Sequence, residues 1–105
     1  MLKGIVAENA RTVTIEKIQK VVAGYFKVSQ SDFKGKRRSK EISFPRQVAM
    51  ALCRELTDAS LPAIGEAFGG RDHATVLYAC RKMKEEESRG GKIKDIFGSL
   101  REGFR

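Results

Sequence analysis

Apolar residues recur at helical spacing along much of the chain, and the clearest run begins shortly after Thr12. The members of this run that share one helical face are Ile15, Ile18, Val21, Val22, Tyr25 and Phe26. Residues three, four and seven positions apart lie on the same side of an α-helix, so the run predicts an amphipathic helix. Thr12 or Thr14 can cap its first turn.

Polar residues, proline and glycine divide the rest of the chain into further predicted helices. Polar side chains before Phe33 can cap one short helical turn there. Pro45 suits the first turn of the next helix, because its missing N–H would be unpaired there anyway. The longer helices are predicted over residues 43–56, 61–68, 72–83 and 93–104. No segment alternates as a strand does, so we expect a compact all-α fold of about six helices.

The length of 105 residues suits one hydrophobic core. We interpret residues 1–11 as the end of a connector helix or a tail, and residues 12–105 as one helix-turn-helix domain. No apolar run approaches the roughly 20 residues that a bilayer span needs, and no signal-peptide pattern opens the chain. The expected location is therefore cytoplasmic.

A very short turn separates the predicted helices over residues 61–68 and 72–83, and this spacing is typical of a helix-turn-helix. Asp58 or Ser60 can cap the first of these helices. Gly69 and Gly70 can end it, because glycine accepts the left-handed conformation that follows many helices. Gly65 removes a side chain where the two helices would approach each other.

The second helix of this pair begins with small polar groups that can read base edges in a major groove. A carboxylate at Asp72 can accept from cytosine, the imidazole of His73 can donate or accept, and the methyl group of Ala74 can pack on thymine. The alternative is that Asp72 only caps the helix and that His73 is an ordinary surface residue.

Charge favours a nucleic-acid partner. The chain has 21 Lys and Arg against 13 Asp and Glu, a net charge of +8. Residues 34–46 hold six basic side chains and one acid, and we expect a loop over residues 34–41. Lys36 and Arg37 can contact phosphates there, while a flexible arginine can also enter a narrow minor groove. The alternative is a solvated face without a partner.

Further phosphate contacts are expected from the neighbouring helices. Arg46, Gln47 and Arg54 lie at helical spacing, and Arg46 and Arg54 share one side of their helix, so they can grip the same phosphate backbone. Ser60 and Thr75 place hydroxyl groups at helix N-termini, where the free amides and the dipole favour phosphate.

Several segments together resemble the C-terminal domain of the DnaA family of bacterial replication initiators, over roughly residues 12–104. They are RQVAM at 46–50, LCRELT at 52–57, SLP at 60–62 and AFGGRDH at 67–73. The resemblance implies an all-helical, Trp-repressor-like fold that binds short non-palindromic boxes at replication origins. The family usually has threonine at the position of Ala74, and the missing hydroxyl puts the strength of base preference there in doubt.

The resemblance also implies roles for individual residues. It implies that Arg38 enters the minor groove. The major-groove readers that it implies are Pro62, Asp72, His73 and Ala74. The phosphate contacts that it implies are Arg46, Gln47, Arg54, Ser60, Leu61 and Thr75.

No cofactor, metal or catalytic activity is expected in this chain. The only histidine, with Cys53 and Cys80, cannot complete a zinc ligand set, and both cysteines are expected to be buried free thiols. No phosphate-binding loop of the Gly-x-x-x-x-Gly-Lys-Ser/Thr type occurs. ATP is expected only in an upstream domain of a longer protein.

The function expected is sequence-specific binding of double-stranded DNA at origin boxes by a monomeric module. A longer protein would oligomerise through other domains. One alternative is a transcription regulator that uses the same helix-turn-helix. The other is a basic module that binds RNA or protein without reading sequence. It lacks the interleaved aromatic residues of a single-strand stacking platform, since the aromatics near the loop, Tyr25, Phe26 and Phe33, are expected in the core.

Overall fold

The computed structural model describes residues 13–36 and 39–104. Within these ranges the chain forms five α-helices and one 3-10 helix, and no strand, which confirms the all-α prediction. The elements are α2 (Ile15–Phe26), η1 (Gln30–Lys34), α3 (Lys40–Leu56), α4 (Leu61–Ala67), α5 (His73–Ser88) and α6 (Lys92–Glu102). The connector predicted in residues 1–11 lies outside the described residues.

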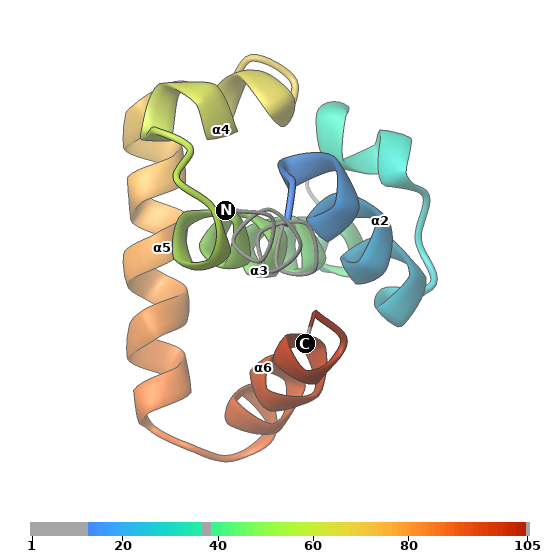
Figure 1. Cartoon of the computed structure of the whole chain (residues 1–105), viewed down its shortest axis with the longest axis vertical. Helices are drawn as coiled ribbons and strands as arrows, with labels where there is room; N and C mark the ends of the chain where they lie inside the picture. The colour runs from blue at the N-terminus through green and yellow to red at the C-terminus, as the bar shows by residue number, and fades with distance from the viewer. Residues whose placement is uncertain (1–12, 37–38, 105) are drawn as a thin grey trace, which may run out of the picture.

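Helix α3 lies at the centre of the molecule. Figure 1 shows α5 along one side of it, α2 and η1 on the other, and α6 crossing below. Helix α4 sits at the N-terminal end of α5, so the two helices of the helix-turn-helix form one corner of the molecule. Among the described helices, none is long and apolar enough to cross a membrane.

The core is formed largely by the apolar faces that the helical spacing predicted, although Tyr25 of the first face is 46% exposed. Phe33 of η1 and Phe68 at the end of α4 are fully buried, with ring centroids 6.0 Å apart. The other buried apolar residues include Ile18, Val22, Val48, Ala49, Leu52, Cys53, Ile64, Val76, Met83, Phe97 and Leu100. Because they come from all six elements, each helix is held against α3 or its neighbours by burial of apolar surface.

Polar side chains cap four of these elements at positions within the predicted capping regions. Thr14 accepts from the backbone N–H of Lys17 at 3.0 Å to begin α2, and a capping box at Ser29 begins η1. Ser60, rather than Asp58, caps α4 by accepting from Ala63 at 3.2 Å. Each cap satisfies an amide that the first turn of a helix leaves unpaired.

Helix α3 begins earlier than the sequence predicted, which corrects the start placed at residue 43. The carbonyl of Ser39 already accepts from Ile42 and Ser43, at 2.9 and 2.8 Å. Ile42 is 3% exposed, so burying its side chain stabilises the additional turn. Pro45 therefore lies inside α3 instead of at its start. The segment between η1 and α3 is consequently shorter than the loop expected over residues 34–41.

Helix α5 continues to Ser88, beyond the end predicted near Met83, through three consecutive glutamates. Nη2 of Arg89 lies 3.6 Å from Oε2 of Glu85, and its Nη1 lies 3.7 Å from Oε2 of Glu86. This positive charge reduces the repulsion between the neighbouring glutamates. Glu87 forms a two-fold hydrogen-bonded ion pair with Arg101 of α6, at 2.5 and 2.8 Å. These cations explain why an acidic run remains helical.

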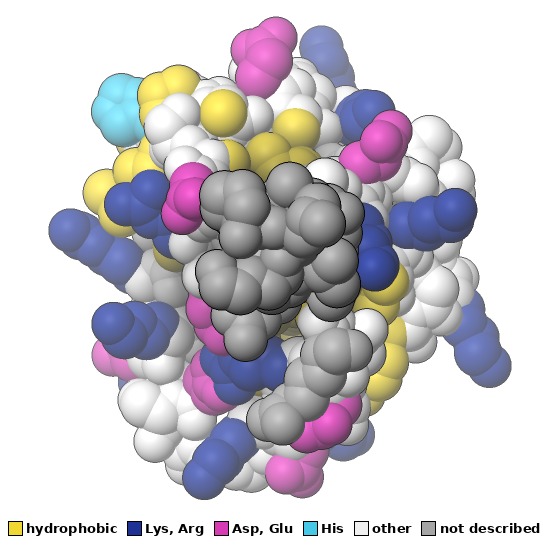
Figure 2. All heavy atoms as spheres, viewed as in Figure 1, with side chains coloured by type: hydrophobic (Ala, Val, Ile, Leu, Met, Phe, Trp, Pro, Cys, Tyr) yellow, Lys and Arg dark blue, Asp and Glu magenta, His cyan; other side chains and the backbone are white. Residues whose placement is uncertain are grey.

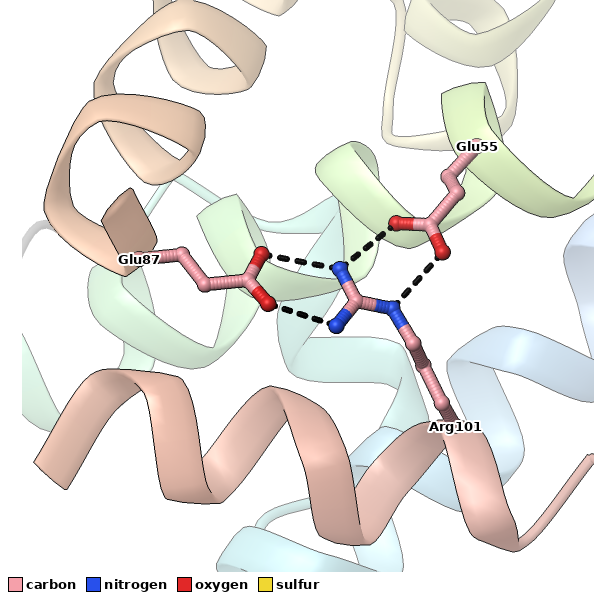
Figure 3. Close-up of polar contacts among 3 residues, drawn as sticks. All are labelled: Glu55, Glu87 and Arg101. Carbon is pink, nitrogen blue, oxygen red and sulfur yellow. Dashed lines mark hydrogen bonds and ion pairs between the residues drawn. The ribbon is translucent and has the colours of Figure 1, made fainter. Parts of the chain in front are cut away.

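Arg101 joins three helices at once. Besides Glu87 it binds Glu55 of α3, through Nε at 2.7 Å and Nη2 at 2.9 Å, so both carboxylates are held in two-fold contact (Figure 3). The fork of the guanidinium matches carboxylate geometry, which makes such pairs stronger than single contacts. The hydrogen bonds that Arg101 donates lower the pKa of Glu87. The hydrogen bonds to Glu87 and Glu55 also raise the pKa of Arg101 itself.

Candidate nucleic-acid interface

The turn of the helix-turn-helix is built around the carbonyl of Gly65. This oxygen accepts from the backbone N–H of Phe68 at 3.1 Å, Gly70 at 3.1 Å and Arg71 at 2.9 Å. A Cβ atom at Gly65 would lie 2.0 Å from the carbonyl oxygen of Arg71. The prediction that Gly65 permits a close approach is therefore confirmed, and the approaching group is the backbone of the turn itself.

Gly69 and Gly70 both adopt the left-handed conformation, with φ of +89° and +80°. The surroundings of the two residues differ. A Cβ atom at Gly69 would lie 2.3 Å from the carbonyl oxygen of Lys34, whereas the space around Gly70 is open. Two separate features therefore require glycine at position 69. One is the left-handed backbone, and the other is the close contact between the turn and the end of η1.

The first turn of α5 is exposed, as the helix-turn-helix pattern predicted. Asp72 caps it, because Oδ1 accepts from the backbone N–H of Thr75 at 2.9 Å. This hydrogen bond lowers the pKa of Asp72, so the carboxylate is ionised at neutral pH. The side chains of His73, Ala74 and Thr75 are exposed beside it. Capping and exposure coexist at Asp72, so its role as a cap does not remove it from the surface.

A hollow of about 400 Å³ opens beside this turn. It is lined by Lys34, Gly35, Lys36, Arg46, Gly69, Arg71 and Thr75. Four of these residues are cationic and none is acidic, so their fields add and favour an anion. The hollow lies between residues 34–36 and Thr75 in the first turn of α5.

Arg46 and Arg54 lie in different surroundings, although both belong to α3. Arg46 is only 6% exposed, and its Nη2 donates to the carbonyl oxygen of Asp32 at 3.1 Å. Burial lowers the pKa of Arg46, and the charge of Arg71 lowers it further. Arg54 is exposed. The expectation that the two arginines contact one phosphate backbone from one side of the helix therefore depends on the part of Arg46 that lines the hollow.

The remaining predicted residues lie at the start of α4, within α3, after η1 or outside the described ranges. At the start of α4, Ser60 and Pro62 are exposed and Leu61 is half-buried. Gln47 is half-buried and Lys36 is exposed. The predicted minor-groove residue Arg38 and the phosphate residue Arg37 lie outside the described residues.

Figure 2 shows lysine and arginine side chains projecting from several sides of the molecule. Net charge therefore does not by itself locate an interface. At the hollow, four cationic residues line one space next to the tip of α5.

Neither cysteine has a reactive environment. Cys53 is buried, and burial raises the pKa of its thiol to about 12; Cys80 is half-buried, and burial raises its pKa as well. Both are free thiols, as predicted, but only Cys53 is buried, so the predicted burial of Cys80 is corrected. In the part of the chain that the structure describes, no group of three or more His, Cys, Asp or Glu residues could hold a metal ion.

Two residues near the tip of α5 were missed in the sequence. Arg71 donates to carbonyl oxygens of segments distant in the chain, and no local pattern predicts such contacts. Tyr78 is 61% exposed, one turn after Ala74, with the ammonium of Lys82 at 5.9 Å from its ring centre. The helical spacing from Ala74 indicates this position of Tyr78, since residues four apart share a face.

Comparison with known proteins agrees with this geometry. The family model described as "Bacterial dnaA protein helix-turn-helix" matches residues 15–83, which include α2 to α4 and most of α5. A crystal structure of a DNA replication initiation factor is similar in fold, with a TM-score of 0.76 and 38% sequence identity. The match covers 86% of this chain and 28% of that protein. The chain belongs to the bacterial DnaA helix-turn-helix family.

Proposed function

We propose that this domain binds double-stranded DNA sequence-specifically at replication-origin boxes, as part of a bacterial replication initiator. One observation supports this most strongly. The exposed N-terminal turn of α5 lies directly beside a hollow with four cations and no acid among its lining residues. A helix of this kind enters a major groove, while the adjacent cations hold the phosphates of the same duplex.

In this proposal, base recognition comes from the starts of α4 and α5. Asp72, His73 and Ala74 face the base edges of the major groove, with Pro62 packing against the same groove. Arg38 supplies a minor-groove contact. Because Ala74 offers a methyl group without a hydroxyl, it would favour thymine by apolar contact alone.

The proposed phosphate contacts surround these readers and set the register. They are Lys36, Arg37, Arg46, Gln47, Arg54, Ser60, Leu61 and Thr75, partly through side chains and partly through amides at the helix N-termini. Arg46 reaches a phosphate only within the hollow, since its guanidinium is otherwise buried. The hydroxyl of Tyr78 can contact the backbone one turn farther along α5.

The chain acts in this proposal as a monomeric DNA-binding part of a longer protein. It corresponds to 28% of the similar initiation factor, which leaves most of that protein for other activities. ATP binding and oligomerisation belong to those other parts, and this domain contributes binding without catalysis. The cytoplasm is the compartment in which such a protein meets the chromosome.

Fluorescence anisotropy with labelled duplexes tests the proposal. The chain is titrated with a duplex that carries a DnaA box and with a scrambled duplex of equal composition, each at two salt concentrations. We expect tighter binding to the box at both, with affinities that fall as salt rises because counterions are released. Equal affinity for the two duplexes would contradict sequence-specific binding.

A further inference from the structure

We propose that Arg71 is a positioning residue that fixes the offset between residues 33–35, which precede the proposed minor-groove reader in the chain, and the tip of α5. It thereby sets the spacing at which the domain reads two grooves. This inference rests on the proposed function.

The guanidinium of Arg71 binds three backbone carbonyls from two separate parts of the chain. Nη2 donates to the carbonyl oxygen of Gly35 at 2.6 Å, and Nη1 donates to that of Phe33 at 3.3 Å. Nη1 also donates to the carbonyl oxygen of Phe68, at the end of α4. One side chain thus joins the end of η1 to the turn of the helix-turn-helix.

A second contact supports the same junction. The Cα of Gly69 packs so closely on the carbonyl of Lys34 that a Cβ atom would not fit, at 2.3 Å from the oxygen. The segment before Lys36 is therefore held at backbone level by both Gly69 and Arg71. Contacts to backbone atoms restrain the path of the chain more directly than contacts to mobile side-chain ends.

Arg71 is also adjacent in the chain to the first turn of α5, which is the proposed reading element. Asp72, the N-cap of α5, follows Arg71, and the N–H of Arg71 donates to the carbonyl of Gly65 at 2.9 Å. The position of Arg71 is therefore coupled to the start of α5 on one side and to the basic segment on the other. Residues 33–35 and the start of α5 are therefore held together by contacts to one residue.

A rigid offset has a consequence for DNA, because the grooves of a duplex are related by its helical repeat. Moving a recognised sequence by one base pair shifts it by about 3.4 Å along the axis. The same step rotates it by about 35°, given the repeat of 10–10.5 base pairs per turn. A domain with a fixed offset loses one set of contacts at the displaced spacing, whereas a domain with a loose offset adapts.

The test compares wild type with Arg71→Lys and Arg71→Ala on two kinds of duplex. One places an A·T-rich sequence, whose narrow minor groove attracts arginine, directly beside the box, and the other displaces that sequence by one base pair. Lysine keeps the positive charge but lacks the planar fork that reaches several carbonyls. Arg89→Ala serves as the control, because it removes an exposed arginine whose ion pairs lie within one helix and its cap.

We expect displacement to weaken binding of wild type and of Arg89→Ala by about tenfold or more, as a mismatched base pair does. Both Arg71 variants should bind the correctly spaced box more weakly, yet lose less than about threefold on displacement. A merely structural role would lower affinity for both duplexes equally and leave the ratio unchanged.

Three results separate the modes of failure. The quantity compared is the affinity for the correctly spaced duplex divided by the affinity for the displaced duplex. If this ratio in both variants equals that of wild type, the inference is wrong. It is also wrong if wild type binds both spacings equally while it prefers the box to a scrambled duplex. Absence of any box preference in wild type would instead overturn the proposed function. Circular dichroism melts show whether each variant is folded at the assay temperature, and if Arg71→Ala unfolds, the Lys variant decides.

Discussion

Single residues in the helix-turn-helix each meet more than one physical demand. Asp72 caps α5 through Oδ1 and remains exposed at the proposed reading surface. Gly69 combines a left-handed backbone with a contact that excludes a side chain. Such positions are sensitive to small substitutions, because a change that satisfies one demand can violate the other.

At Gly65, replacement by alanine should destabilise the domain by about 2–3 kcal/mol, since overpacking forces the backbone to move. The added Cβ atom would meet the carbonyl oxygen of Arg71 at 2.0 Å. Gly98→Ala is the matched control, because Gly98 lies in α6 and a Cβ atom added there would meet nothing within 4 Å. It should stabilise by about 0.5–1 kcal/mol. Urea denaturation of both variants measures this difference, and equal effects would contradict it.

His73→Ala should weaken binding to the preferred box by about 1–3 kcal/mol and affect nonspecific binding less, because the imidazole contacts a base edge. Arg38→Ala should do the same through the minor groove. Titrations against the box and its scrambled form measure both variants. Equal losses on the two duplexes would remove the residue from the base-reading set.

At the scale of elements, the N-termini of α4 and α5 and the outer part of α3 surround the proposed DNA path. Helix α3 has a double role, because its inner face forms the centre of the core while Arg54 remains exposed near its end. Because α3 starts early, at Lys40, the connection from the end of η1 is short.

Arg54→Ala should weaken binding to all sequences and reduce the salt slope by about 1, because one phosphate contact and its released counterion are lost. Affinities measured over a series of salt concentrations give the slope. Arg89→Ala, which removes the same charge from the end of α5, should leave the slope close to that of wild type. A slope unchanged by Arg54→Ala would exclude this residue from the phosphate contacts.

At the scale of the whole molecule, Arg101 holds α6 against α3 and α5 and so closes the helical core. Its side chain is 34% exposed, and those of Glu55 and Glu87 are 41% and 23% exposed. Solvent screens such pairs, so the network contributes about 1 kcal/mol despite its two-fold geometry. Apolar burial of Phe97 and Leu100 provides the larger part of the α6 contact.

This network predicts a pH-dependent stability. The pKa of Glu87 is lowered in the folded state by its hydrogen bonds from Arg101, so its contribution is present above the unfolded pKa of about 4.3. It is lost as pH falls through the folded-state pKa, because the unfolded chain then binds the proton more readily. Arg101→Ala should therefore lower Tm at pH 7 and have less effect near pH 3. Thermal melts of Arg101→Ala and Arg89→Ala at both pH values test this, and a pH-independent difference would contradict it.

The periodicity of apolar residues was sufficient to predict an all-α domain and the two helices of its helix-turn-helix, because helix faces repeat over a few neighbouring residues. Capping residues and the glycines of the turn also act locally, so Asp72 and Gly69 could be assigned from sequence, whereas the choice between Asp58 and Ser60 as a cap was decided by the structure. The resemblance to the DnaA family then indicated a specific partner. Boundaries were less predictable, since the start of α3 depends on the burial of Ile42.

Only the tertiary structure decided how distant segments combine. The burial of Arg46, the hollow shared by Lys34 and Thr75, and the joining of three helices by Arg101 depend on packing between segments far apart in the chain. The role of Arg71 is of the same kind, because backbone carbonyls are present at every residue and carry no sequence signal. A sequence determines which helices form through local periodicity, whereas packing selects which carbonyls and cations meet.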